Sequence, residues 1–309
     1  MSIKILLASP RGFCAGVQRA IDIVEAAIKH YGLPLYVKHQ IVHNIKVIKY
    51  FEDKGVIFVE DVQDIPDGSN VIFSAHGSAN ISFDIASEKK LNVIDAVCPL
   101  VESVHSHAKS LERKGCEIIL IGKRTHIEVI GTVGKVDSDI IIIENEDDAR
   151  SIEVKSPDKV GYITQTTLNV DETMPIINVL KSRFPKIIGP HHGNICYATK
   201  NRQDVISTIA PQCDVVFIVG SQNSSNSKRL REVGEISGCS KVYLLNSRED
   251  IEEEYLNGAK VIGISAGASA PEHLVQGIIQ YIKDNFNDIE IEEVFGAVEN
   301  ITFKMPQFK

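Results

Sequence analysis

Three cysteines each lie where an apolar, strand-like run gives way to a helix-like run. The segments ILLASPRGFCAGVQRAI, LNVIDAVCPLVESV and KIIGPHHGNICYATKNRQDV contain Cys14, Cys98 and Cys196. A helix N-terminus favours the thiolate form of cysteine, and thiolates bind zinc and iron–sulfur clusters. The chain has no CxxC pair, so spacing alone leaves both a metal role and a structural role open. We predict one metal site assembled from three parts of the chain.

Hydrogen-bonding side chains follow several other apolar runs. Ligands of open α/β sheets bind beyond the carboxyl ends of the strands, so chemistry is expected at these positions. Imidazole, hydroxyl and amide groups there suit phosphoryl oxygens near turns that lead into helices. The pattern therefore predicts an anion site beside the thiolates. The candidate residues are His43, His76, His126, Glu128, Thr166, Ser224, Ser225, Asn226 and Ser269.

Several of these candidates also have a plain structural interpretation. Glu128 follows His126 by two residues, so it is either a proton donor or a first-turn carboxylate stabilised by the helix dipole. Thr166 is compatible with an ordinary strand end, and the tract 224–226 is compatible with an N-cap cluster. The residue types alone do not choose between these alternatives.

The remaining cysteines and histidines are predicted to be structural. A buried cysteine usually behaves as a small hydrophobe, and this interpretation applies to Cys116, Cys213 and Cys239. An isolated histidine is more often a surface or hydrogen-bonded residue than a catalyst. That interpretation applies to His30, His39, His105, His107, His191, His192 and His273.

Short β-branched runs alternate with helical patterns along the whole chain. This alternation is typical of mostly parallel sheets covered by helices, so we predict an α/β fold. The predicted strands are IKILLAS, LPLYVKH, GVIFV, NVIFSAH, LNVIDAV, CEIILIG, DIIIIEN, VGYITQT, KIIG, CDVVFIVG, KVYLLNS and KVIGISAG.

A chain of 309 residues favours two or three domains, because it exceeds what one compact core usually holds. Twelve predicted strands over three cysteine-headed segments give about four strands each, so we expect three similar α/β units. We predict domains at 14–96, 97–193 and 194–281, each carrying one of the three cysteines. Residues 1–13 are expected to complete one of the sheets. Residues 282–309 are expected to form a C-terminal extension.

Composition disfavours several classes of partner. The chain has 33 Lys plus Arg against 41 Asp plus Glu, a formal net charge of -8, and no basic cluster with interleaved aromatics. Nucleic acid is therefore not an expected partner. The N-terminal apolar run ILLA is too short for a signal-peptide core or a membrane span. We expect a cytoplasmic protein with reduced cysteines and no membrane partner.

Two other functional classes fit part of the pattern. A zinc hydrolase could use His126 and Glu128 as the H-x-E of nucleobase deaminases, but the P-C-x-x-C partner of that motif is missing. A non-enzymatic redox or iron sensor would also explain the cysteines, because a cluster with a free coordination site is easily oxidised and could report on redox state. A sensor would not require three histidines and a Ser-Asn tract around one pocket.

Nine motifs together resemble the 4-hydroxy-3-methylbut-2-enyl diphosphate reductase family, the last enzyme of the methylerythritol phosphate route to isoprenoids. The match covers essentially the whole chain in order and shows no departure at a position that the family uses. It implies a trefoil of three α/β/α domains around a central 4Fe-4S cluster, with Cys14, Cys98 and Cys196 as ligands of three irons. The motifs are FCAGVQRAI, QIVHN, SAHG, VCPLV, THIEVIG, TQTTL, ICYAT, GSQNSSNSKRL and SAGASAPEHLV.

The resemblance also implies roles for the polar residues. Glu128, Thr166 and His126 would be catalytic, with Glu128 as the proton source and Thr166 also near the substrate. Partly protonated imidazoles would give charge-assisted hydrogen bonds to an anion that the net charge of -8 otherwise repels. The diphosphate would be held by His43, His76, His126, Ser224, Ser225, Asn226 and Ser269.

The implied reaction is reductive dehydroxylation of 4-hydroxy-3-methylbut-2-enyl diphosphate to isopentenyl diphosphate and dimethylallyl diphosphate. Two electrons would enter one at a time through the cluster. Its fourth iron would lack a protein ligand and would bind the substrate hydroxyl. The expected electron donor is a ferredoxin or a flavodoxin.

Overall fold

The computed structural model describes residues 3–190 and 193–308, so His191 and His192 lie outside the described residues. By its internal contacts the chain divides into two compact units, and each is described by itself. Unit 1 comprises Met1–Gln18, His43–Tyr50 and Tyr197–Thr302. Unit 2 comprises Arg19–Val42, Phe51–Cys196 and Phe303–Lys309.

Unit 1 is built on a five-stranded sheet in the order β10-β9-β11-β1-β12, in which every pair is parallel. Most of its strands are Val- and Ile-rich and buried, as is typical of parallel sheets with both faces covered. The strands are β1 (Ile3–Ser9), β9 (Val215–Val219), β10 (Val242–Leu245), β11 (Val261–Ala266) and β12 (Ile289–Phe295).

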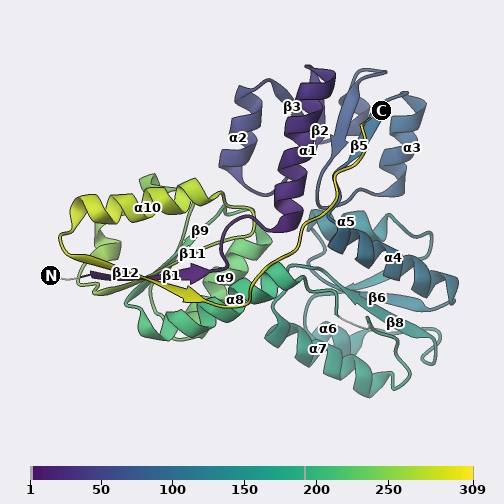
Figure 1. Cartoon of the computed structure of the whole chain (residues 1–309). Helices are drawn as coiled ribbons and strands as arrows, with labels where there is room; N and C mark the ends of the chain where they lie inside the picture. Colours follow the sequence, from purple (N-terminus) through teal and green to yellow (C-terminus); the bar gives the residue numbers. More distant parts are fainter. Residues whose placement is uncertain (1–2, 191–192, 309) are drawn as a thin grey trace. The chain divides into compact units, whose positions relative to one another are not determined.

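Helices cover both faces of this sheet, with α10 on one face and α8 and α9 on the other (Figure 1). Successive side chains of a strand point to opposite faces, so Ile5 and Leu7 of β1 pack in the α10 core while Leu6 and Ala8 pack in the α8 and α9 core. These helices are α8 (Tyr197–Ile209), α9 (Ser225–Ile236) and α10 (Glu272–Asn285). Short 3₁₀ helices lie at Ala210–Gln212, Arg248–Asp250 and Glu253–Leu256.

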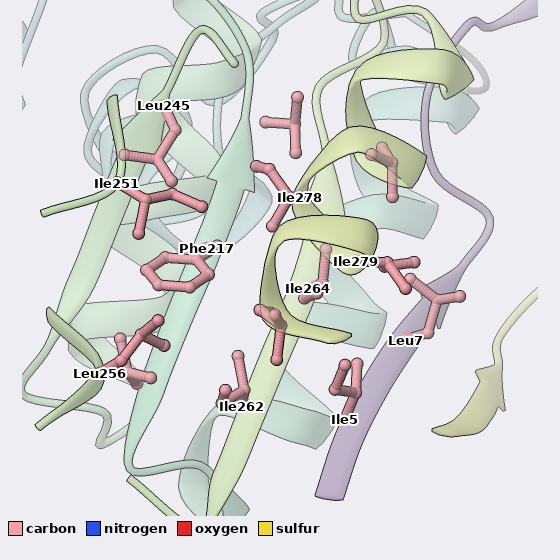
Figure 2. Packing of buried hydrophobic residues seen from close by; sticks show 14 of the residues in the cluster. Ile5, Leu7, Phe217, Leu245, Ile251, Leu256, Ile262, Ile264, Ile278 and Ile279 are labelled. Carbon is pink, nitrogen blue, oxygen red and sulfur yellow. The ribbon is translucent and has the colours of Figure 1, made fainter. Parts of the chain in front are cut away.

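The core beneath α10 is made almost entirely of aliphatic side chains around one aromatic ring. Figure 2 shows Phe217 of β9 and Ile264 of β11 packed with Ile278 of α10. All three side chains are fully buried. This core anchors the strands whose carboxyl ends carry predicted site residues.

Unit 2 contains two smaller parallel sheets, ordered β3-β2-β4-β5 and β7-β6-β8. The first sheet contains β2 (Leu35–Lys38), β3 (Val56–Val59), β4 (Asn70–Phe73) and β5 (Asn92–Asp95). The second sheet contains β6 (Glu117–Ile121), β7 (Ile140–Ile143) and β8 (Val160–Thr164).

Side chains of α4 and α5 pack on one face of the second sheet, and those of α6 and α7 on the other. The helices within unit 2 are α3 (Asn80–Glu88), α4 (Pro99–Arg113), α5 (Ile127–Val133), α6 (Glu146–Ser151) and α7 (Val170–Arg183), with a 3₁₀ helix at Val62–Asp64. Two further helices begin in unit 1 and end in unit 2, namely α1 (Ala15–Tyr31) and α2 (Ile45–Asp53). None of the helices in the described part of the chain is long and apolar enough to cross a membrane.

The predicted α/β class with parallel sheets is confirmed, and three such sheets are present. The predicted strand KIIG is wrong, because Ile188 forms only an isolated bridge with Gly161. Strand β12 lies within the predicted C-terminal extension and was not expected. The predicted domain limits and the trefoil arrangement stay predictions.

Truncating Phe217 should destabilise the fold because the side chain is fully buried. We expect Phe217→Ala to lower the free energy of unfolding by about 3–5 kcal/mol, since it leaves a cavity. Phe295→Ala is the matched control, because Phe295 is 75% exposed on β12. Chemical denaturation followed by circular dichroism gives both values. Equal losses for the two variants would contradict the packing described here.

Candidate functional site

The predicted site residues form two groups, one in each unit, and most lie in loops that follow strands. This placement agrees with the rule that ligands bind at the carboxyl ends of parallel strands. The Cys14 group, in unit 1, comprises Cys14, His43, Ser224, Ser225, Asn226 and Ser269. The Glu128 group, in unit 2, comprises His76, Cys98, His126, Glu128, Thr166 and Cys196.

Cys14 lies in the loop between β1 and α1, and backbone hydrogen bonds tie this loop to the segment that follows β11. The N–H of Gly12 donates to the carbonyl of Ala266 (3.3 Å), and the N–H of Cys14 donates to that of Ala268 (3.2 Å). The N–H of Val17 points at the Cys14 sulfur, 3.5 Å away. The first turn of α1 therefore directs a backbone N–H toward this sulfur.

His43 precedes α2 in a loop that is hydrogen-bonded to two strand ends of unit 1. The hydroxyl of Ser269, after β11, donates to the His43 carbonyl (2.9 Å). The N–H of Ile45 donates to the hydroxyl of Ser221, after β9 (3.1 Å). These bonds bring His43 and Ser269 together, as the site prediction requires.

The N-terminus of α9 presents a buried amide without a protein partner. Ser224 is the N-cap, and its Oγ accepts from the N–H of Ser227 (3.2 Å). The Asn226 side chain is 5% exposed, and neither its Oδ1 nor its Nδ2 has a partner among the described residues. A side chain at Gly267 would collide with Ser227 Oγ, so the loop after β11 runs close to this helix start. Because an unpaired buried amide is costly, Asn226 points to a polar ligand.

In unit 2, Cys98 is the N-cap of α4, and its N–H donates to the carbonyl of Ala75 (3.0 Å). The next residue along from Ala75 is His76, whose Nδ1 lies 3.3 Å from Ser74 Oγ. The rings of His76 and His126 meet nearly at right angles with centroids 6.5 Å apart. One thiol and two imidazoles are thus held within one loop network.

His126 is the N-cap of α5, and its Nδ1 accepts from the N–H of Glu128 (3.2 Å). Because Nδ1 is an acceptor, the single proton of the neutral ring is assigned to Nε2. The ring can therefore donate from Nε2 whether it is neutral or charged.

Glu128 is a buried carboxylate held by a single residue. Its side chain accepts from the N–H of Thr166 (2.6 Å) and from the Thr166 hydroxyl (2.8 Å). The carbonyl of Thr166 in turn accepts from the N–H of Cys196 (2.9 Å). Burial raises the pKa of Glu128 to about 7, although the two hydrogen bonds from Thr166 lower it. A carboxyl group that titrates near neutral pH is suited to general acid catalysis.

The three predicted ligand thiols differ in setting from the other three. Cys14, Cys98 and Cys196 lie directly before helices α1, α4 and α8, and each is a partly exposed cysteine outside any disulfide of the described chain. Burial raises the pKa of Cys213 to about 12 and also raises the pKa of Cys239, which keeps these thiols neutral. The remaining thiols pack in or against hydrophobic cores, as predicted: Cys116, Cys213 and Cys239.

Three soft thiols at helix N-termini fit an iron–sulfur cluster chemically. In the part of the chain that the structure describes, no three His, Cys, Asp or Glu side chains form a group that could hold one metal ion. A cluster binds each thiolate through a separate iron, so its ligands need not meet at one ion. Convergence of the three thiols stays a prediction.

His105 is a buried residue that sequence reasoning assigned to the surface or to a satisfied role. It lies on α4 with its ring fully buried, 3.4 Å from Glu102. Burial lowers its pKa to about 4 although Glu102 raises it. A side chain at Gly77 would overlap the His105 ring, so His105 supports the loop that carries His76. The sequence pattern that could have indicated the burial of His105 is its helical spacing from Val101 and Val104, both of which are buried.

Residues 5–283 match the family model described as LytB protein. The chain belongs to the LytB protein family. Two curated LytB relatives carry the name 4-hydroxy-3-methylbut-2-enyl diphosphate reductase. The one from Aeromonas salmonicida is 48% identical over 307 residues, covering 98% of each chain. The one from Pectobacterium atrosepticum is 46% identical over 308 residues, covering 99% of this chain and 97% of the relative.

Solved structures of LytB relatives agree with this assignment. The reductase from Plasmodium falciparum has a TM-score of 0.94 and 39% identity, covering 100% of this chain and 96% of that chain. A second reductase, described as the terminal enzyme of the non-mevalonate pathway, has a TM-score of 0.66 and 30% identity, covering 91% of this chain and 99% of that chain. The family predicted from the nine motifs is confirmed.

Glu128 should make the stability of the iron-free protein depend on pH. Its pKa is about 7 when folded against an ordinary value of 4.5, so the folded state holds a proton that the unfolded state releases. The stabilising contribution is full below about pH 4.5 and is lost as the pH rises toward 7, by roughly 3 kcal/mol in total. Unfolding curves across this range should show that loss in the wild type relative to Glu128→Gln.

Thr166→Val is the companion variant for this measurement. It removes the hydroxyl that lowers the pKa of Glu128. The pH at which half of the stabilising contribution of Glu128 is lost should therefore be higher in this variant. Parallel pH profiles for the wild type and Glu128→Gln would contradict the raised pKa.

Proposed function

We propose that this chain reduces 4-hydroxy-3-methylbut-2-enyl diphosphate to isopentenyl diphosphate and dimethylallyl diphosphate. The observation that carries the proposal is the buried Glu128–Thr166 pair, bonded through the Thr166 carbonyl to Cys196. In a chain of the LytB family, this pair would act as a proton donor close in the hydrogen-bond network to the Cys196 backbone. The curated relatives carry the name of this reductase.

The diphosphate is proposed to bind donors from both groups. In unit 1 the helix N-terminus at Ser224 and the unpaired Asn226 amide suit an anion, and Ser225 adds a hydroxyl. Ser269 is proposed to join them by turning its hydroxyl from the His43 carbonyl to the anion. In unit 2, His76 and the Nε2 of His126 add imidazole donors. His43 completes the proposed set. Asn226 supports this assignment most directly, because a phosphoryl oxygen would satisfy its buried nitrogen.

Cys14, Cys98 and Cys196 are proposed to hold a 4Fe-4S cluster, which their thiol chemistry fits. When bound, such a cluster supplies electrons one at a time and an iron position open to the substrate hydroxyl. A ferredoxin or a flavodoxin is the proposed electron donor, and this choice stays a prediction.

Glu128 is proposed to deliver the proton that leaves with the hydroxyl oxygen. With a pKa of about 7, a large share of the group is protonated at neutral pH and can be protonated again between turnovers. The Thr166 hydroxyl lies 2.8 Å from Glu128 Oε2, so it can relay the proton or orient the carboxyl group. Burial excludes water, which protects a reactive intermediate from side reactions.

Replacing the carboxyl group should stop the chemistry without emptying the site. We expect Glu128→Gln to keep the cluster and substrate binding but to lose at least about 100-fold in turnover, the usual size of a general-acid contribution. Steady-state reduction and substrate titration measure the two effects. Glu88→Gln, which removes the same charge from an exposed position of unit 2, is the control. Turnover like the wild type in Glu128→Gln would remove Glu128 from the mechanism.

Removing one proposed ligand should remove the cluster. We expect Cys98→Ser to lose iron, visible absorption and activity together, because serine is a poor ligand for a soft metal. Cys239→Ala is the control, since Cys239 packs in a core away from the predicted ligands. Iron content and absorption of anaerobically prepared protein measure the outcome. An intact cluster in Cys98→Ser would refute the ligand assignment.

Anaerobic purification followed by an assay with a reduced viologen tests the proposed function as a whole. A brown protein that consumes the hydroxylated allylic diphosphate supports the proposal. A colourless zinc protein would indicate a hydrolase, and a cluster without turnover would indicate a sensor. Either result would overturn the proposed activity.

A further inference from the structure

The chain continues after β12 as a C-terminal segment, residues 296–308, which contains no helix or strand within its described length (Figure 1). Two residues of this segment bind arginines on helices. Each arginine also donates to a backbone carbonyl just ahead of a proposed ligand cysteine. The two arrangements lie in different units and use different helices.

The first arrangement centres on Arg202 of α8, whose side chain is 1% exposed. Its guanidinium donates to the carbonyl of Gly12 from two nitrogens, at 2.8 and 3.2 Å. It also pairs with Glu299 of the C-terminal segment at 2.9 Å. A buried arginine needs a charge partner, and Glu299 is that partner. The carbonyl held in this way lies two residues before Cys14.

The second arrangement centres on Arg19 of α1. Its Nη1 donates to the carbonyls of Ala96 and Val97, at 3.3 and 3.0 Å. Its Nε donates to the carbonyl of Lys304 in the C-terminal segment (2.8 Å). Val97 directly precedes Cys98, so the guanidinium holds the backbone that carries this thiol.

We infer that the C-terminal segment positions two of the three cysteine loops: Glu299 acts on the Cys14 loop through Arg202, and the Lys304 carbonyl acts on the Cys98 loop through Arg19. The inference rests on the proposed cluster for its function, but the contacts belong to the polypeptide alone. Groups that orient metal ligands commonly change metal affinity by about 10–100-fold when removed. Positive charge near the thiolates also favours the reduced, more negative form of a cluster.

Two matched pairs of variants test the inference. Glu299→Gln removes the partner of Arg202, and Glu292→Gln removes the same charge from an exposed ion pair with Lys4 on the neighbouring strands. A chain ending at residue 302 lacks the Lys304 carbonyl, whereas a chain ending at 305 keeps it. Lys304→Ala is a further control, because the Arg19 contact uses the backbone of Lys304.

Hydrogen exchange of the iron-free protein reads each loop separately. The Cys14 N–H is bonded to Ala268 and the Cys98 N–H to Ala75, so both exchange rates report loop order. Glu299→Gln should speed exchange at Cys14 by about tenfold and leave Cys98 unchanged. The chain ending at 302 should do the reverse, and the controls should match the wild type.

The holoenzyme gives the second readout. Cluster release to a chelator should be about tenfold faster in Glu299→Gln and in the chain ending at 302 than in their controls. Arg19→Gln should lower the reduction potential of the cluster. Arg19→Lys should lower it less, because the positive charge remains. A wild-type protein that binds no cluster would defeat the proposed function while the exchange data still test the positioning role. Two results would overturn the inference. One is wild-type exchange rates at Cys14 and Cys98 in every variant, and the other is equal acceleration at both cysteines in Glu299→Gln.

Discussion

Parallel pairing of every strand places the carboxyl ends of neighbouring strands at one edge of each sheet. The loops that leave this edge carry most of the predicted site residues. In unit 1 the loops after β1, β9 and β11 are joined by backbone and hydroxyl hydrogen bonds. In unit 2 the loops after β4, β5, β6 and β8 carry the thiol, imidazole and carboxyl groups. The loops that carry the predicted site residues thus begin at the ends of strands that are fixed in the sheets.

Within unit 2 the decisive electrostatic feature is the burial of Glu128, which is only 3% exposed to water. Burial favours the protonated form, whereas the two donors of Thr166 favour the ionised form. The balance leaves a carboxyl group that exchanges its proton near neutral pH. The carbonyl of the same Thr166 accepts from the N–H of Cys196, so one residue is hydrogen-bonded to both Glu128 and Cys196.

Much of this arrangement could be predicted from sequence, because β-branched runs and the residues after them obey local rules. Eleven of the twelve predicted strands are observed, and Cys14, His76 and Cys98 all follow strand ends. Strand β12 was not predicted because three of the seven residues of IEIEEVF are acidic, a composition that suits an exposed sheet edge but resembles a polar tail. KIIG was misleading because its apolar run packs beside β8 with a single bridge.

The contacts that sequence reasoning could not find join residues far apart in the chain. Nothing local marks Arg202 as the partner of Gly12, or His105 as the support for Gly77. The division of the predicted site residues between unit 1 and unit 2 likewise depends on contacts between segments that are far apart in the chain. Such pairings depend on topology, and helical or strand periodicity carries no information about them.

The position of β1 has a consequence for how the protein is made. This strand lies between β11 and β12, so a segment synthesised before the strands of unit 2 pairs with two segments synthesised after them. The sheets of unit 2 draw all their strands from the stretch between these elements and can form while synthesis continues. Unit 1 must wait for release of nearly the whole chain, so its many non-local pairings make it the slow step of folding. The Cys14 loop, which is hydrogen-bonded to the segment after β11, therefore takes its final shape later than the loops of the unit 2 sheets.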